Sequence, residues 1–153
     1  MQRVDILTAS IDDIKRLTEI DEVSFPEGER WSSTSFSWSI ESSDEIVLSA
    51  VDADTGDIAG YAAVSYVLDE ANLNKIAVDP EYRKKGIGSL LLRQMEEYLP
   101  VQINVYNLEV REGSSEAVSM YLRSGYKITG KRRRFYRNPD EDALIMTKRK
   151  VMI

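Results

Sequence analysis

The chain has 153 residues, a net charge of −6, and neither cysteine nor histidine. This length favours one domain, spanning residues 1–153, and the composition excludes a disulfide framework, a thiolate zinc site, a cysteine nucleophile and a histidine base. The charge is uneven, because residues 1–60 carry 14 acidic and 4 basic side chains whereas residues 61–153 carry 12 acidic and 16 basic ones.

The first part of the chain predicts one strand, two helices and three further strands. Alternation of apolar and polar residues indicates the strands, and helical spacing of apolar residues indicates the helices. In chain order we expect a strand over 3–8, a helix capped by Ser10 that ends before residue 25, a short helix from Ser33 through Ile40, and strands over 45–52, 58–68 and 71–78. Asp12 and Asp13 favour the start of the first helix, because the helix dipole stabilises anions there.

The second part predicts two helices that alternate with strands. Leu91 and Met95 lie on one stripe of a helix over 88–99, and Pro100 marks its end. The remaining expected elements are a strand over 102–110, a helix capped by Ser114, a strand from about Tyr126 and a last strand over 142–148. The order β-α-α-β-β-β-α-β-α-β-β predicts an α/β fold in which helices pack against a mixed sheet.

The segment 83-RKKGIG-88 joins the strand over 71–78 to the following helix. The first N–H groups of a helix have no intrahelical partner, and the helix dipole places partial positive charge there, so a helix start is a site for anions. The two glycines let a phosphate approach the backbone, and the three cations add charge. The segment is neither a P-loop nor a GxGxxG motif. A pyrophosphate is the natural ligand, and a plain basic turn explains the residues equally well.

The same segment is similar to the R/Q-x-x-G-x-G/A motif of the GNAT superfamily of N-acetyltransferases. Residues 76–92 resemble the whole strand, loop and helix unit of that superfamily, and residues 108–126 resemble its second conserved block. Residues 132–146 and the pair 25-FP-26 resemble the protein N-terminal acetyltransferases, in particular the type that acts on a ribosomal-protein alanine. The resemblance implies the GNAT fold, a mixed central sheet of about seven strands with four helices packed on it. It also implies acetyl-CoA as the cosubstrate.

The resemblance assigns roles in acetyl-CoA binding. The backbone at the end of one strand would pair with the pantetheine arm, and this stretch comprises Ile76, Ala77 and Val78. The pyrophosphate would be held by a loop and a helix start that comprise Arg83, Lys84, Lys85, Gly86, Gly88 and Ser89. Where the family has an asparagine that reaches the cofactor, this chain has Ser114, whose shorter side chain favours capping of the helix over a cofactor contact.

Two residues match the catalytic positions of the family. Tyr121 matches the tyrosine that serves as general acid in many members, where a phenol assists the departing coenzyme A thiolate. Its place on the apolar face of the predicted helix is equally consistent with a core residue. Glu109 matches the glutamate proposed as general base, and it is the best candidate in a chain without histidine. The alternative for Glu109 is a strand residue that pairs with Arg111 or another cation.

Four residues match the walls of the peptide slot in the family. Phe25 and Pro26 would form one wall, and Phe135 and Tyr136 the other. The family commonly has two tyrosines at the second place, so Phe135 lacks a hydroxyl that Tyr136 retains. Ordinary packing is the alternative for all four, and it is favoured for Phe135.

An N-terminal amine, with a pKa of about 8, needs less help from a base than a lysine amine at about 10.4.

The sequence therefore predicts direct transfer of the acetyl group to the N-terminal α-amine of a protein or peptide. A ternary complex is expected, because no cysteine can carry an acetyl-enzyme intermediate. A ribosomal protein is one candidate substrate. The alternatives are a small amine or a lysine side chain as acceptor and, in another class, a non-catalytic module that binds acyl-CoA or a partner.

The remaining expectations concern partners and location. We expect no nucleic acid, because no basic helix or aromatic platform adjoins the run 131-KRRR-134 and the chain is acidic overall. No metal site is expected. No membrane partner is expected either, because no apolar run approaches the length of a membrane span, and the default location is cytoplasmic. The sequence carries no signal for the oligomeric state.

Overall fold

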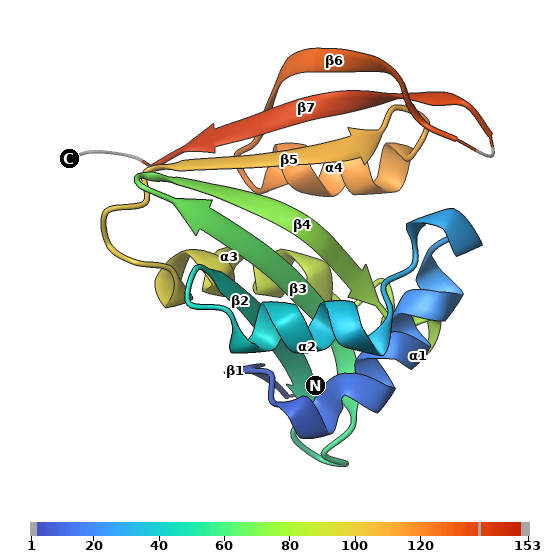
Figure 1. Ribbon diagram of the computed structural model, residues 1–153, viewed down its shortest axis with the longest axis vertical. Coiled ribbons are helices and arrows are strands. Elements are labelled where there is room, and N and C mark those ends of the chain that lie inside the picture. Colours follow the sequence, from blue (N-terminus) through green and yellow to red (C-terminus); the bar gives the residue numbers. More distant parts are fainter. Residues whose placement is uncertain (1–2, 138, 151–153) are drawn as a thin grey trace.

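The computed structural model describes residues 3–137 and 139–150, which form a seven-stranded mixed sheet and four α-helices (Figure 1). The strands lie in the order β1-β2-β3-β4-β5-β7-β6. The strands are β1 (Val4–Thr8), β2 (Glu45–Asp52), β3 (Ile58–Val67), β4 (Glu70–Val78), β5 (Val105–Arg111), β6 (Lys127–Tyr136) and β7 (Glu141–Arg149). The helices are α1 (Ile14–Ser24), α2 (Ser33–Glu41), α3 (Ile87–Tyr98) and α4 (Ser115–Arg123).

The predicted order of strands and helices is confirmed, and two boundaries differ by more than one residue. The helix expected from Ser10 begins with a 3₁₀ turn over Ile11–Asp13 before α1 starts. The strand expected over 102–110 begins only at Val105, because the N–H of Ile103 donates to the carbonyl of Pro100 and closes a turn. Ile103 is fully buried in this turn, so its apolar character reflects an anchor in the core and not a strand position.

The pairing of β4 with β5 divides the sheet. These two strands are parallel, and their ladder runs from Glu70 opposite Val105 to Leu73 opposite Leu108. β4 then continues to Val78 and β5 to Arg111, and Figure 1 shows the two strands separating toward these ends. The other neighbouring strands are antiparallel. The separation opens the sheet at the place where the loop after β4 begins.

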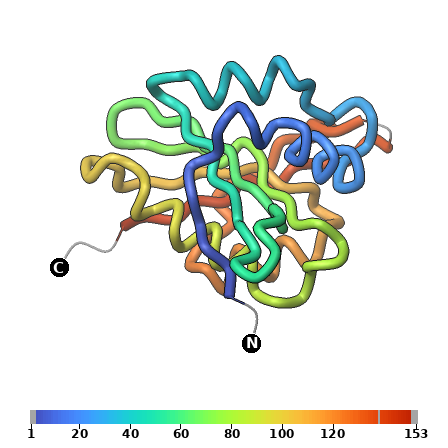
Figure 2. Tube along the Cα trace, turned by 90° about the horizontal axis from the view of Figure 1, so that it is seen from below, coloured from blue at the N-terminus to red at the C-terminus, as the bar shows by residue number. Residues whose placement is uncertain are grey.

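The helices cover the two faces of the sheet. Figure 2 shows α2 on one side of the strands and α3 and α4 on the opposite side. Leu91 and Tyr106 belong to a buried cluster between the sheet and the pair α3 and α4. Leu17, Phe36 and Tyr61 belong to a second cluster under α1 and α2, in which the rings of Phe36 and Tyr61 meet edge to face at 5.3 Å. Within the described residues, no helix is long and apolar enough to cross a membrane.

Removal of the hydroxyl should change the free energy of unfolding in opposite directions at two buried tyrosines, Tyr61 and Tyr126. Among residues 3–137 and 139–150, the buried hydroxyl of Tyr126 has no hydrogen-bond partner, whereas that of Tyr61 donates to the carboxylate of Asp21. An unpaired buried hydroxyl is costly, and a bond to a charged group stabilises by about 1.5–3 kcal/mol. We expect Tyr126→Phe to keep or raise the unfolding free energy, and Tyr61→Phe to lower it by about 1–3 kcal/mol in urea denaturation. A loss of more than about 1 kcal/mol for Tyr126→Phe would contradict this assignment.

Candidate active site

Two cavities meet where β4 and β5 separate. The first, here the loop cavity, has a volume of about 700 Å³ and lies between the end of β4, the start of α3 and one side of α4. The second, here the strand cavity, has a volume of about 740 Å³ and lies between the 25–31 segment, β4, β5 and the end of β6. The residues that line both cavities are Ser24, Phe25, Ile76, Ala117 and Tyr121. A molecule in one cavity can therefore contact a molecule in the other at this junction.

The loop that leads from β4 to α3 is anchored at its start by Asp79. Its carboxylate accepts the N–H of Glu81 at 2.9 Å and the guanidinium of Arg16 in α1 at 2.9 Å. Burial alone would raise the pKa of Asp79, but these two hydrogen bonds lower it below its ordinary value. The backbone N–H of Asp79 also donates to the carbonyl of Ala59. The loop thus leaves the sheet in a fixed direction.

The start of α3 presents backbone N–H groups to the loop cavity. Gly86 is the N-cap residue with φ of +81°, a left-handed conformation that side chains with Cβ rarely adopt. The carbonyl of Gly86 accepts a hydrogen bond from the N–H of Leu90, and this is the first hydrogen bond of the helix that involves Gly86. The N–H groups of the first turn precede this bond, and its residues Ile87, Gly88 and Ser89 all line the cavity. Lys84 is also left-handed, with φ of +64°.

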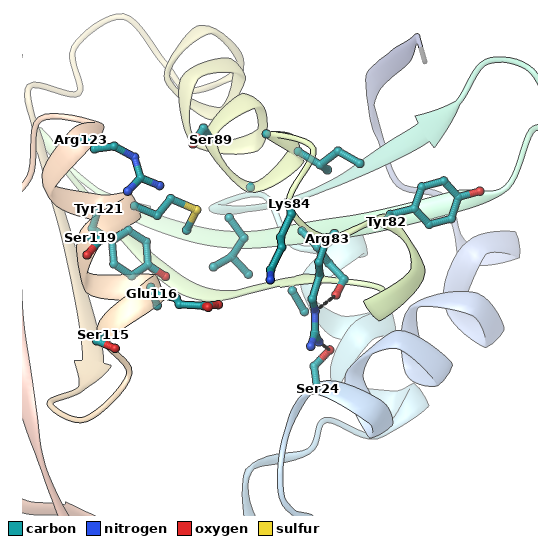
Figure 3. Close-up of a pocket in the computed structure, with 18 of the residues that line it drawn as sticks. Ser24, Tyr82, Arg83, Lys84, Ser89, Ser115, Glu116, Ser119, Tyr121 and Arg123 are labelled. Atoms are coloured by element: carbon teal, nitrogen blue, oxygen red, sulfur yellow. Dashed lines mark hydrogen bonds between the residues drawn. The ribbon is translucent and has the colours of Figure 1, made fainter. Parts of the chain in front are cut away.

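The cations of the loop are not equivalent. The guanidinium of Arg83 donates to the carbonyl of Val78 at 2.8 Å and to the hydroxyl of Ser24 at 3.4 Å, so it lies across the end of β4. Figure 3 shows Arg83 and Lys84 on one side of the loop cavity, with Arg123 of α4 on the opposite side. Lys85 is not among the lining residues, and its ammonium is 5.6 Å from the ring of Tyr82.

The structure gives Gly88 a packing role that the sequence did not reveal. A Cβ atom at this position would lie 2.7 Å from the sulfur of Met120 in α4. Glycine at position 88 therefore allows α3 and α4 to approach each other beside the loop cavity. The motif reveals the glycine but not its neighbour, because Met120 belongs to a separate helix.

The predicted capping bond of Ser114 is wrong. Ser114 is the N-cap residue of α4, but its side chain makes no capping hydrogen bond. Its ψ of 69° differs from the extended value that a capping serine usually adopts. The helix therefore starts through backbone hydrogen bonds, such as the one from the N–H of Val118 to the carbonyl of Ser114. The residue lines the strand cavity.

Tyr121 is buried and yet lies at the junction of the cavities. It is 5% exposed, and its ring meets that of Tyr126 edge to face at 5.9 Å. Figure 3 shows its side chain projecting from α4 toward the loop cavity. Burial raises the pKa of Tyr121, so the phenol keeps its proton at neutral pH and can donate it. The core interpretation and the catalytic interpretation are therefore compatible.

Glu109 extends from β5 into the strand cavity. Its carboxylate pairs with the guanidinium of Arg132 at 3.2 Å, so the alternative interpretation is right that Glu109 pairs with a cation, and that cation is not Arg111. Arg111 instead pairs with Glu29 and, at 3.2 Å, with Glu141. Arg111 thus connects the 25–31 segment to β7 across the strand cavity.

The four predicted slot residues line one cavity. Phe25 and Pro26 border the strand cavity from the segment after α1, and Phe135 and Tyr136 border it from the end of β6. The rings of Phe135 and Tyr136 meet edge to face at 5.0 Å, and the guanidinium of Arg111 lies 4.4 Å from the ring of Tyr136. Burial and the nearby charge of Glu109 raise the pKa of Tyr136 to about 12.

Sequence reasoning missed Lys75, Glu29 and Arg111, which also line the strand cavity. Burial lowers the pKa of Lys75, and the carboxylates of Asp21 and Glu29 oppose that shift. Buried and exposed residues alternate along β4, and Lys75 falls on a buried position. A cation at such a position indicates a buried partner of opposite charge. Within the described part of the chain, no cluster of three or more acidic, histidine or cysteine side chains could hold a metal ion.

The arrangement can hold two substrates. The start of α3 and the cations beside it suit an anionic group, and the part of β4 that has left β5 suits an extended chain. The strand cavity suits a second molecule, which would reach the first beside Tyr121. Such a site fits transfer of a group between a phosphate-bearing donor and an acceptor.

Comparison with known proteins gives a consistent result. Residues 11–126 match the model of the acetyltransferase (GNAT) family. The chain is 38% identical over 94 residues to the ribosomal protein bS18-alanine N-acetyltransferase of Escherichia coli, and the match covers 60% of this chain and 64% of that relative, less than two thirds of its length. It is 31% identical over 137 residues to the putative enzyme of that name from Bacillus subtilis, with 89% of each covered.

The fold agrees with this match. The crystal structure of the Escherichia coli ribosomal-protein-S18-alanine N-acetyltransferase superposes with a TM-score of 0.87 and 28% identity, and the comparison covers 99% of this chain and 96% of that one. The expected seven-stranded GNAT fold with four helices is thereby confirmed. The chain belongs to the acetyltransferase (GNAT) family.

Proposed function

We propose that the protein transfers the acetyl group of acetyl-CoA to the N-terminal α-amine of a protein or peptide. The observation that carries this proposal is the meeting of two cavities at Tyr121, one beside the start of α3 and one lined by Phe25, Phe135 and Tyr136. Membership of the acetyltransferase family supports acetyl-CoA as the donor. The two adjoining cavities and the absence of cysteine support direct attack in a ternary complex.

The loop cavity would hold acetyl-CoA. The first turn of α3, together with Arg83 and Lys84, would bind the pyrophosphate, and Lys85 would add charge from outside the cavity. The backbone of Ile76, Ala77 and Val78 would pair with the pantetheine arm, because β4 has separated from β5 along this stretch. Ser114 borders the strand cavity, so we assign it no contact with the pyrophosphate.

The strand cavity would hold the substrate N terminus between Phe25 and Pro26 on one side and Phe135 and Tyr136 on the other. Glu109 would accept the proton that the α-ammonium loses, either directly or through a water. The neutral amine would then attack the thioester carbonyl and form the N–C bond. The nitrogen would release its second proton to solvent as the C–S bond breaks. Tyr121 would give its proton to the departing sulfur, and a proton from solvent would restore the phenol. Positioning of amine and thioester provides much of the rate.

The names of the relatives support a ribosomal-protein N terminus as one candidate substrate. A cytoplasmic location belongs to the same proposal, because ribosomal proteins are synthesised there. The test is incubation with acetyl-CoA and two sets of peptides, one with free N termini and one with blocked N termini and a free lysine, read by mass spectrometry. We expect acetylation of the first set. Acetylation confined to the lysine set would favour the side-chain alternative, and binding without turnover would favour a non-catalytic module.

Replacement of Gly86 should weaken donor binding. Its φ of +81° would strain any side chain, by about 1–2 kcal/mol, and valine would distort the helix start. We expect Gly86→Val to raise the Kd for coenzyme A by about tenfold or more in isothermal titration calorimetry. Gly56→Val is the matched control, because Gly56 has φ of +78° and equally open surroundings but lies outside both cavities. Equal Kd values for the two variants would contradict this role.

Glu109→Gln and Tyr121→Phe should each lower kcat by about 10²-fold or more, because each removes one proton-transfer group. The controls are Glu112→Gln, which removes a carboxylate paired with Lys131 at 2.7 Å, and Tyr126→Phe beside Tyr121. Steady-state kinetics should give kcat within about twofold of the parent for both controls. Full turnover of Glu109→Gln or Tyr121→Phe would remove the corresponding assignment and leave the fold unaffected.

A further inference from the structure

A buried ion pair lies beside the strand cavity. Asp21 of α1 is fully buried, Lys75 of β4 is 9% exposed, and the ammonium of Lys75 lies 2.6 Å from the carboxylate of Asp21. Removing two charges from water is costly, and their attraction often does no more than offset that cost. A contribution to stability alone therefore explains the buried pair poorly, and its contacts point to a second role in holding the neighbouring segment.

Asp21 holds both ends of the segment that forms one wall of the slot. One oxygen of its carboxylate accepts from Lys75 and from the hydroxyl of Tyr61. The other oxygen accepts the backbone N–H of Trp31 at 2.7 Å. The backbone carbonyl of Asp21 accepts the N–H of Phe25 at 3.0 Å. The segment from Phe25 to Trp31 is therefore fixed at its beginning and at its end by one residue.

Lys75 contacts the same segment through its aromatic rings. Its ammonium lies 4.2 Å from the ring centroid of Phe25 and 5.4 Å from that of Trp31. Desolvated contacts between a cation and a ring are attractive, and Phe25, Trp31 and Lys75 all line the strand cavity. The position of the Phe25 ring thus depends on a charge, and that charge depends on Asp21.

We propose that Asp21 and Lys75 are positioning residues that hold the wall formed by Phe25 and Pro26, and that they thereby set the width of the slot for the first residue of the substrate. This inference rests on the proposed N-terminal acetyl transfer. It assigns selection of the first side chain to a carboxylate that lines neither cavity and to the ammonium that it holds at the border of the strand cavity. Loss of the pair leaves the anchor of the loop after β4 intact, because Asp79 and Arg16 hold that loop separately.

The test compares the parent with Lys75→Met and with the double variant Asp21→Asn, Lys75→Met. The single variant leaves a buried carboxylate without its cation and is expected to lose stability, whereas the double variant removes both charges. We expect both to raise the peptide KM by about tenfold, which corresponds to about 1.4 kcal/mol, with kcat changed by less than about threefold. The ratio of kcat/KM between peptides that begin with alanine and with leucine should shift by about tenfold toward leucine. The Kd for coenzyme A should stay within about twofold.

Lys148→Met is the matched control. It removes an ion pair of similar length, 2.7 Å to Glu96, that lies outside both cavities. Its peptide KM and its alanine-to-leucine ratio should equal those of the parent. Unchanged values in a folded double variant would overturn the proposal.

Hydrogen exchange separates this inference from the proposed function. We expect amides of residues 25–31 to exchange about tenfold faster in the double variant than in the parent, and Lys148→Met to leave them unchanged. If the parent acetylated no α-amine, the proposed function would fail and the exchange rates would still decide whether the pair positions the wall. Unchanged exchange would overturn the positioning role whatever the parent acetylates.

Discussion

The parallel pairing of β4 and β5 stops after Leu73 and Leu108, and the rest of the site depends on that interruption. A continuous sheet would satisfy every backbone group of both strands internally. Because the strands separate instead, a stretch of β4 backbone borders an opening and two cavities form around it. The sheet therefore provides both the rigid frame and the opening into which substrates fit.

Two helices use this opening in different ways. α3 begins at the edge of the loop cavity, where Gly86 lets its unpaired N–H groups face the interior. α4 turns its buried face to the core and places Tyr121 where the cavities meet. Gly88 leaves room for the side chain of Met120 between the two helices. The helix start that we propose to bind the pyrophosphate and the tyrosine that we propose as proton donor thus both belong to packed helices.

Local signals in the sequence predicted the order of elements and the loop before α3, because capping residues, glycines and apolar spacing act over a few neighbours. The resemblance to the family added Glu109, Phe25 and Tyr136 as candidate site residues, and these residues line one cavity. Interactions between distant residues escaped prediction. Lys75 and Asp21 are 54 positions apart, and Arg111 and Glu29 are 82 apart. The sequence also did not predict that the Ser114 side chain makes no capping hydrogen bond, because that bond depends on a backbone angle that residue type does not determine.

The short ladder between β4 and β5 has a mechanical consequence. It joins four strands on one side to three on the other through the pairs from Glu70–Val105 to Leu73–Leu108. Beyond this ladder the two strands share no backbone hydrogen bonds in the described residues, so side-chain contacts alone hold their far ends relative to each other. Those ends border the cavities, and Arg111 at the end of β5 pairs with Glu29 of the 25–31 segment and with Glu141 of β7. The width of the opening therefore depends on ion pairs, so high salt concentration should weaken the contact that holds it.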